Sequence, residues 1–160
     1  MFAAVVSFMM LMSFEIGPTM GAIVPVQNEG DPWKPGFVIG LKTRYCFSEI
    51  DLDFQLRFVE LGIDPDSSKG YTYTMVPVTI GLSKNFGFMR FGAGSGLYPI
   101  EARKELVESI ESVWNGTFAG MYVSLGKDFA LGTNTFDISS KFNIIDFNSL
   151  WIGLTASYLF

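Results

Sequence analysis

Charged side chains recur at alternate positions in several segments of this chain. Lys42 and Arg44 lie two positions apart, and so do Asp51 and Asp53. Side chains at alternate positions of an extended strand point to the same face. Opposite charges that share a buried face must pair, because an unpaired buried charge is costly. We therefore predict an ion-pair network made of Glu15, Lys42, Arg44, Asp51, Asp53, Arg57, Arg90, Asp137 and Lys141.

The same residue types could carry catalysis, but the sequence argues against it. Asp51 and Asp53 could act as a carboxylate pair in acid–base chemistry, yet Arg44, Arg57 and Arg90 are available to neutralise them. The chain has no His, the residue most often used as a metal ligand and a frequent general base. We predict that the protein is not an enzyme and has no catalytic residue, metal site or cofactor.

Two further features suggest chemistry only at first sight. The single cysteine, Cys46, cannot form an internal disulfide and has no metal-ligand neighbours, so we interpret it as a small apolar residue. The glycine-rich run 92–96 matches neither the GxGxxG nor the GxSxG pattern. We interpret its glycines as small residues on the inner face of a strand, which places Ser95 on the outer face.

The elements that position these side chains are strands. Apolar and polar residues alternate with period two in segments of about ten residues, a pattern typical of membrane barrels. Pro77 interrupts one segment and predicts a bulge or local kink, because proline cannot donate to the ladder. The predicted strands are residues 13–24, 36–47, 51–62, 71–83, 88–99, 117–129, 134–145 and 150–160.

About eight strands predict an all-β fold, namely a closed antiparallel up-and-down transmembrane barrel. Membrane barrels have short turns at one end and longer loops at the other. The tight connections are near 48–50, 84–87 and 130–133, and the longer or more polar ones are near 27–35, 62–70, 100–116 and 146–149. In the longest loop, Ala102, Leu106, Ile110 and Val113 recur at helical spacing, which predicts a short helix over 101–114.

The composition favours a wall that faces lipid. Of the 160 residues, 49% are hydrophobic and only 17% are charged, against about 25% charged in an average soluble domain. The chain has no run of roughly 20 apolar residues such as a membrane helix needs. The net charge of −5 argues against a nucleic acid partner.

The polar faces of the strands predict a filled interior. Their charges nearly cancel, and a barrel of about eight strands is just wide enough for side chains to fill it. We therefore expect an ion-paired lumen and not an open pore. Aromatic residues near the strand ends predict two girdles, Trp33, Tyr71, Tyr73, Trp114 and Trp151 at the loop end and Phe14, Tyr45, Phe47, Phe86, Phe129, Tyr158 and Phe160 at the turn end.

Residues 1–12 are apolar and resemble part of a secretory signal peptide, although they lack a Lys/Arg start. We predict a signal-peptide remnant over 1–12 and a barrel domain over 13–160. The alternative is that these residues extend the first strand.

Two stretches resemble the small outer-membrane β-barrel family, the OmpA-type or porin-like single-barrel domains. They are residues 75–98, with VPVTIGL at 76–82 and FGAGSGLY at 91–98, and residues 151–160, which end in GLTASYLF. The resemblance implies a Gram-negative outer membrane, contact with its lipid, and a monomer. It also implies a C-terminal signal for the barrel-assembly machinery, formed by Gly153, Tyr158 and Phe160.

The sequence leaves two functions open. The first is an integral outer-membrane barrel with a structural or surface-interaction role. The alternative is a soluble, lipocalin-like barrel that binds a small apolar ligand, which would turn the apolar face inward and place Lys42, Arg57 and Arg90 on the exterior.

Overall fold

The computed structural model describes residues 12–26, 33–47, 49–63, 71–106, 109–146 and 149–160. This part of the chain consists of strands and turns, without a helix, so no helix in it could cross a membrane. The strands are β1 (Met12–Pro25), β2 (Trp33–Phe47), β3 (Ile50–Ile63), β4 (Tyr71–Met75), β5 (Val78–Asn85), β6 (Arg90–Leu106), β7 (Ser109–Leu131), β8 (Asn134–Ile145) and β9 (Ser149–Leu159). The predicted signal segment lies outside the described residues except for Met12, which begins β1.

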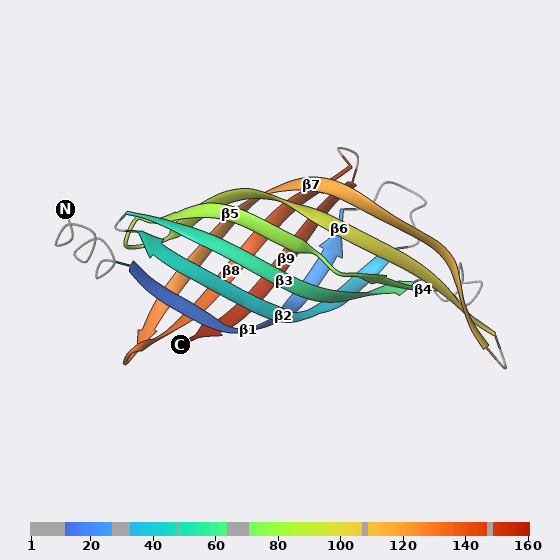
Figure 1. Cartoon of the computed structure of the whole chain (residues 1–160), viewed down its shortest axis with the longest axis horizontal. Coiled ribbons are helices and arrows are strands. Elements are labelled where there is room, and N and C mark those ends of the chain that lie inside the picture. Colours follow the sequence, from blue (N-terminus) through green and yellow to red (C-terminus); the bar gives the residue numbers. More distant parts are fainter. Residues whose placement is uncertain (1–11, 27–32, 48, 64–70, 107–108, 147–148) are drawn as a thin grey trace, which may run out of the picture.

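The strands form one closed antiparallel sheet. β1 pairs with β2 on one side and with β9 on the other, so the first and last strands join. The remaining strands follow in chain order around the barrel, each paired with its neighbours. Because β4 and β5 are two halves of one interrupted strand, the barrel has eight strands, as the sequence predicted (Figure 1).

The interruption falls at Pro77, where the sequence predicted a bulge or kink. On β3, Val59 pairs with Met75 before the gap and Leu56 pairs with Val78 after it, so no extra residue is inserted. The carbonyl of Pro77 still accepts a backbone hydrogen bond from β3 at 3.0 Å, but its ring nitrogen has no hydrogen to donate. The feature is therefore a gap in an unchanged register and not a bulge.

Tight turns lie at one end of the barrel. β5 and β6 are joined by residues 86–89, and β7 and β8 by residues 132–133. Leu131 pairs with Asn134, and Gly132 between them has a φ of 68°. A glycine with positive φ at the first central position is typical of a type II′ turn, whose twist matches that of the flanking strands. These turns fix the register of the strands that carry the charged residues.

The helix predicted over residues 101–114 is wrong. β6 continues to Leu106 and β7 begins at Ser109, and the two remain paired out to these ends, with one irregularity after Ala102. β4 also pairs with this part of β6. The ladder satisfies the backbone groups of both segments, and this outweighs the weak helical spacing of the apolar residues. The hairpin projects beyond the rest of the barrel, at the end away from the C-terminus (Figure 1).

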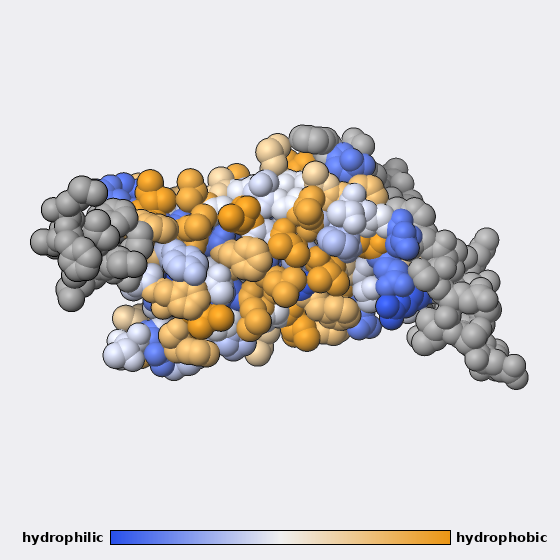
Figure 2. All heavy atoms as spheres, in the orientation of Figure 1, coloured by the Kyte–Doolittle hydropathy of each residue, from blue (hydrophilic) through white to orange (hydrophobic). Residues whose placement is uncertain are grey.

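The outer wall is apolar over its middle. Phe54, Leu56, Ile80 and Leu154 are exposed, whereas the residues that alternate with them are buried. Figure 2 shows a continuous band of hydrophobic side chains around the middle of the visible face, with hydrophilic residues gathered toward the ends. Ser95 lies on this outer face, as predicted. The alternation predicted from the sequence therefore holds, with the apolar residues outward.

Candidate functional site in the barrel lumen

Arg44, on β2, lies at the centre of the charged interior. Its guanidinium is 3.2 Å from Glu15, 3.3 Å from Asp53, 3.4 Å from Asp128 and 3.3 Å from Asp137. These carboxylates belong to β1, β3, β7 and β8, so one side chain connects strands from much of the circumference. Only 1% of the side chain is exposed. A planar guanidinium with five donors suits this role, because it can bind several carboxylates at once.

Lys42 is the second cation of this group. Its Nζ lies 2.9 Å from Asp137 and 3.9 Å from Asp53. Asp137 is completely buried and also accepts a hydrogen bond of 3.2 Å from Ser139. Asp53 and Asp137 therefore each bind two cations, Lys42 and Arg44.

Arg90, on β6, completes the group. Its guanidinium pairs with Asp51 and Asp128 and donates a hydrogen bond of 3.2 Å to Ser83. Ser83 in turn donates to Asp53. The two carboxylates that could have formed a catalytic pair, Asp51 and Asp53, are thus each neutralised by arginine. We call these eight residues the ionic layer: Glu15, Lys42, Arg44, Asp51, Asp53, Arg90, Asp128 and Asp137.

Asp128 was missing from the predicted network. It lies on β7, within the predicted strand 117–129, at the same alternation as Tyr122, which is buried in the lumen. The alternation therefore contained the signal, but Asp128 stands next to the turn, where a charged residue is ordinarily solvated. The structure places it within reach of two arginines instead.

Arg57 and Lys141 are buried but lie outside the ionic layer. Among the described residues, neither forms an ion pair, although both were predicted to belong to the network. Lys141 Nζ lies 3.7 Å from the centre of the Tyr122 ring and 3.5 Å from Thr79 Oγ1. The Nε of Arg57 is buried without a hydrogen-bond partner in the described part of the chain.

Glycines on the inner face make room for the large side chains. A Cβ atom on Gly81 would lie 2.2 Å from the Tyr122 hydroxyl, and one on Gly94 would lie 2.7 Å from it. A Cβ on Gly40 would meet the backbone of β3 first, at the carbonyl oxygen of Leu56, and would also lie 3.0 Å from Cγ of Arg57. The prediction that the glycines of the run 92–96 are small residues on the inner face is confirmed at Gly94.

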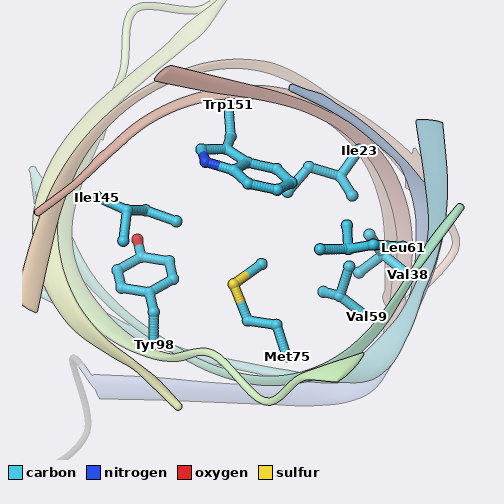
Figure 3. Close-up of a cluster of buried hydrophobic side chains, with 8 residues drawn as sticks. All are labelled: Ile23, Val38, Val59, Leu61, Met75, Tyr98, Ile145 and Trp151. Carbon is cyan, nitrogen blue, oxygen red and sulfur yellow. The ribbon is translucent and has the colours of Figure 1, made fainter. Parts of the chain in front are cut away.

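An apolar layer fills the lumen toward the loop end. Figure 3 shows its side chains converging from the surrounding strands on the middle of the barrel. Tyr98 also donates a hydrogen bond of 3.2 Å to Asn143 Oδ1, which satisfies its buried hydroxyl. The sequence did not predict this layer, whose members are Ile23, Val38, Val59, Leu61, Met75, Tyr98, Ile145 and Trp151.

Of the two aromatic girdles predicted at the ends of the barrel, the structure shows the one at the turn end on the outer wall, but not Tyr73 and Trp151 of the one at the loop end. Trp151 belongs to the apolar layer and Tyr73 packs against it, so neither stands on the outer wall at the loop end. The side chains of Trp33, Tyr71 and Trp114 lie outside the described part of the structure. At the turn end the predicted residues are exposed, namely Phe14, Tyr45, Phe47, Phe86, Phe129, Tyr158 and Phe160.

A hollow of about 250 Å³ opens above the apolar layer at the loop end. Larger hollows, of about 510 and 520 Å³, lie on the outer wall beside Gly96 and Gly40, where the small residues leave shallow depressions. The hollow at the loop end is lined by Leu61, Ile100, Phe118, Ile145, Asp146, Ser149 and Trp151.

The C-terminal residues close the barrel. The backbone N–H of Phe160 donates to Ile16 O at 3.0 Å, and Ile16 N donates back to Phe160 O at 3.1 Å. Tyr158 and Phe160 face outward, with ring centres 6.5 Å apart. Gly153 faces inward and lies in the middle of β9.

The fold and the interior together define a class of protein: an eight-stranded antiparallel barrel with an apolar wall and a lumen packed with ion pairs and apolar side chains. No family model matches the chain, and no curated protein matches it either.

Solved structures do match. The structure of Neisserial surface protein A (NspA) has a TM-score of 0.61 and 13% identity, over 92% of this chain and 97% of that one. Ail, the attachment invasion locus protein of Yersinia pestis, has a TM-score of 0.55 in complex with the heparin analogue sucrose octasulfate, and 0.54 in another structure. Both Ail structures are 18% identical over 93% of this chain and 97% of that one. The chain therefore has the fold of the small outer-membrane barrels that its sequence resembles.

Proposed function

We propose that this protein is an integral outer-membrane β-barrel of a Gram-negative bacterium, present as a monomer, with a structural or surface-interaction role. The observation that carries the proposal is the orientation of the strands, with apolar side chains on the wall and charges in the lumen. Aliphatic residues such as Leu82 and Leu154 are each 58% exposed along a band around the barrel. Soluble monomers rarely expose contiguous apolar patches beyond a few hundred Å². A bilayer removes this wall from water.

Strand length supports the same proposal. A strand tilted by about 45° crosses the hydrocarbon core with about 9–11 residues. β1, β3, β8 and β9 contain 14, 14, 12 and 11 residues, so each spans the core with at most a few residues to spare. β6 and β7 are longer, at 17 and 23 residues, and their hairpin would stand clear of the bilayer on the outer side.

The alternative, a soluble lipocalin-like barrel, has no support in this geometry. It requires an apolar interior and places Lys42, Arg57 and Arg90 on the exterior. Instead, these three residues are 4%, 3% and 8% exposed.

The lumen supports a structural role over transport. A solute that crossed the barrel would meet the ionic layer and the apolar layer in series. It would have to displace Arg44 from four carboxylates and then pass between Met75, Tyr98 and Trp151 without polar contacts. In planar bilayers we expect no stable single-channel steps, and large stable steps would contradict a closed lumen.

The loop end is the side available for surface interactions. The segments that the sequence predicted as the longer connections, 27–35, 62–70, 100–116 and 146–149, together with the strand ends that the structure places there, carry nine Asp or Glu residues against four Lys or Arg residues. Ail was crystallised with a sulfated heparin analogue, a polyanion. An acidic loop end repels such a ligand, so we propose that the surface partner of this chain is neutral or basic.

The C-terminal residues Gly153, Tyr158 and Phe160 are proposed to act as the signal for the barrel-assembly machinery. In the folded barrel, Tyr158 and Phe160 stand on the outer face at the end of the last strand.

Membrane fractionation tests the proposed function. The full chain is expressed in a Gram-negative host, and its outer membranes are separated and washed with carbonate and urea. We expect the protein to stay in the membrane fraction, to need detergent for extraction, and to migrate faster on a gel before heating than after. Recovery from the soluble periplasmic fraction without detergent would contradict the proposal.

A further inference from the structure

The hollow at the loop end has an apolar floor. Its volume is about 250 Å³. Of the residues that line it, Leu61, Ile145 and Trp151 are buried and belong to the apolar layer. Figure 3 shows Ile145 and Trp151 pointing into the lumen. The floor of the hollow is therefore formed by aliphatic and aromatic side chains.

Asp146 and Ser149 form the mouth of the same hollow. Both residues are exposed, whereas the floor residues are buried. The backbone N–H of Asp146 donates a hydrogen bond of 3.0 Å to Ala119 O, which holds the turn after β8 against β7. Among the residues that the structure describes, Asp146 forms no ion pair, whereas every carboxylate of the ionic layer forms at least one. A negative charge thus stands at the mouth of an apolar hollow.

Three properties of the hollow define its ligand. The apolar floor favours a hydrocarbon group, because burial of apolar surface in a concave site is favourable. The carboxylate at the mouth favours a cation, as does the excess of acidic residues at the loop end. The volume of about 250 Å³ lies below the roughly 300–1,000 Å³ of pockets that hold drug-sized ligands, so the ligand must be small.

We propose that this hollow binds a small amphipathic amine, with its hydrocarbon part against Leu61 and Trp151 and its ammonium group at the mouth beside Asp146. The hydroxyl of Ser149, also at the mouth, supplies a further hydrogen-bond acceptor for the ammonium. The inference specifies the basic partner proposed for the loop end, and it rests on the proposed function, which exposes that end to the outside of the cell.

The order of floor and mouth argues against a lysine side chain of a partner protein. A lysine that entered the hollow from outside would carry its ammonium group to the apolar floor, where a buried charge without a partner is costly. A free amine enters with its hydrocarbon end first and keeps its charge in contact with water and with Asp146. The ligand is therefore a small molecule and not an inserted basic side chain.

The fluorescence of Trp151 tests the site directly. Trp33→Phe with Trp114→Phe leaves Trp151 as the only one of three tryptophans. The barrel, refolded in a neutral maltoside detergent, is titrated at constant ionic strength with cyclohexylammonium, cyclohexanol and cyclohexanecarboxylate, and the series is repeated on the native chain by calorimetry. We expect saturable binding of the amine, weaker binding of the alcohol and none of the carboxylate. Equal affinities for amine and alcohol, or no saturable binding of the amine to the native chain, would overturn the proposal.

Asp146→Asn tests the carboxylate. Asparagine keeps the shape of the side chain and tolerates the φ of 52° at this position. Affinity for cyclohexylammonium should fall about fivefold, as expected for an exposed ion pair, and affinity for cyclohexanol should stay the same. Glu49→Gln, which removes an exposed carboxylate at the turn end, should change neither.

An Asp146→Asn barrel that binds the amine as tightly as the native chain would overturn the proposal. If this variant does not fold, the ligand series on the native chain decides. Because these measurements use the refolded barrel, their failure is distinguishable from a failure of membrane fractionation.

Discussion

Nζ of Lys42 on β2 lies 2.9 Å from Oδ1 of Asp137 on β8, although 95 positions separate the two residues in sequence. Two strands, β1 and β9, stand between β2 and β8 around the barrel. The contact therefore spans the lumen and joins two strands that share no backbone ladder. Ion pairs of this kind connect the fold across its interior, in addition to the ladder that connects it around its wall.

Removal of Asp137 should destabilise the barrel strongly. Asp137→Ala leaves Lys42 and Arg44 with less neutralisation in a buried site, and breaking a buried pair costs about 3–5 kcal/mol. The free energy of unfolding, measured by urea titration of the detergent-folded protein, should fall by about that amount. Lys42→Met combined with Asp137→Leu should recover part of the loss.

The matched control is the exposed pair at the turn end. Glu49 accepts a hydrogen bond of 2.7 Å from Lys84, which lowers the pKa of the Glu49 carboxyl. Exposed pairs are screened by solvent, so Glu49→Gln should leave the unfolding curve unchanged. Equal effects of Asp137→Ala and Glu49→Gln would contradict a buried ionic layer.

Two glycine substitutions should differ in their effect on barrel closure. A Cβ on Gly17 would lie 1.7 Å from the carbonyl oxygen of Tyr158, across the seam between β1 and β9. A Cβ on Gly153 would meet nothing closer than 3.8 Å. Gly17→Ala should therefore cost about 1–3 kcal/mol or prevent closure, while Gly153→Ala should fold normally in vitro. The fraction of heat-modifiable protein after refolding measures this.

Gly153→Ala also separates folding from assembly. If Gly153 belongs to an assembly signal, the variant should fold in detergent but accumulate more slowly in the outer membrane of cells. Normal accumulation would remove Gly153 from the proposed signal and leave Tyr158 and Phe160 as its members.

A charge on the wall should be costly only at the depth of the hydrocarbon core. Leu154 and Leu131 are similarly exposed, at 58% and 53%, but Leu154 lies in the middle of β9 and Leu131 next to a tight turn. Leu154→Arg should cost about 2–4 kcal/mol and Leu131→Arg about 0–1 kcal/mol for folding into vesicles. Similar small costs at both positions would be the behaviour of a soluble barrel.

The apolar layer should contribute more stability than an equal side chain on the wall. Met75 is fully buried in the layer, whereas Met20 is 63% exposed. Met75→Ala should lower the free energy of unfolding by about 2–5 kcal/mol, since it leaves a cavity. Met20→Ala should have a much smaller effect in detergent. Comparable losses for the two variants would show that the layer is loosely packed.

The strands and their orientation could be predicted from the sequence because a period of two is a strong local signal. Phe54 and Leu56 alternate with Asp53 and Gln55, and a shift of one residue would expose the charges to lipid. The positions of the tight turns followed from the same pattern.

The contents of the lumen could be predicted only in part. The alternation gave the residues that face inward, but not how they sort along the barrel axis. Ile23 and Met75 share their inner face with polar residues, and nothing local marks them as neighbours in an apolar layer. Arg44 binds carboxylates from strands far apart in sequence, and such pairings leave no local signal. For the same reason, it could not be predicted that Arg57 forms no ion pair with the described residues.

The failed helix at 101–114 has a different cause. Its apolar residues fit helical spacing, but β6 and β7 were already paired below it, and extension of a hairpin adds backbone hydrogen bonds without a new nucleus. A long-range pairing outweighed a local preference.

The orientation of the wall is best tested by spin labels in lipid vesicles. In a Cys46→Ser background, a nitroxide is attached at position 39, where Ile39 stands exposed in the middle of β2, and in a second protein at position 133, in the β7–β8 turn. The label at 39 should be relaxed by oxygen and protected from a water-soluble nickel chelate, with the opposite result at 133. A label at 39 that the chelate relaxes as strongly as the label at 133 would contradict a lipid-facing wall.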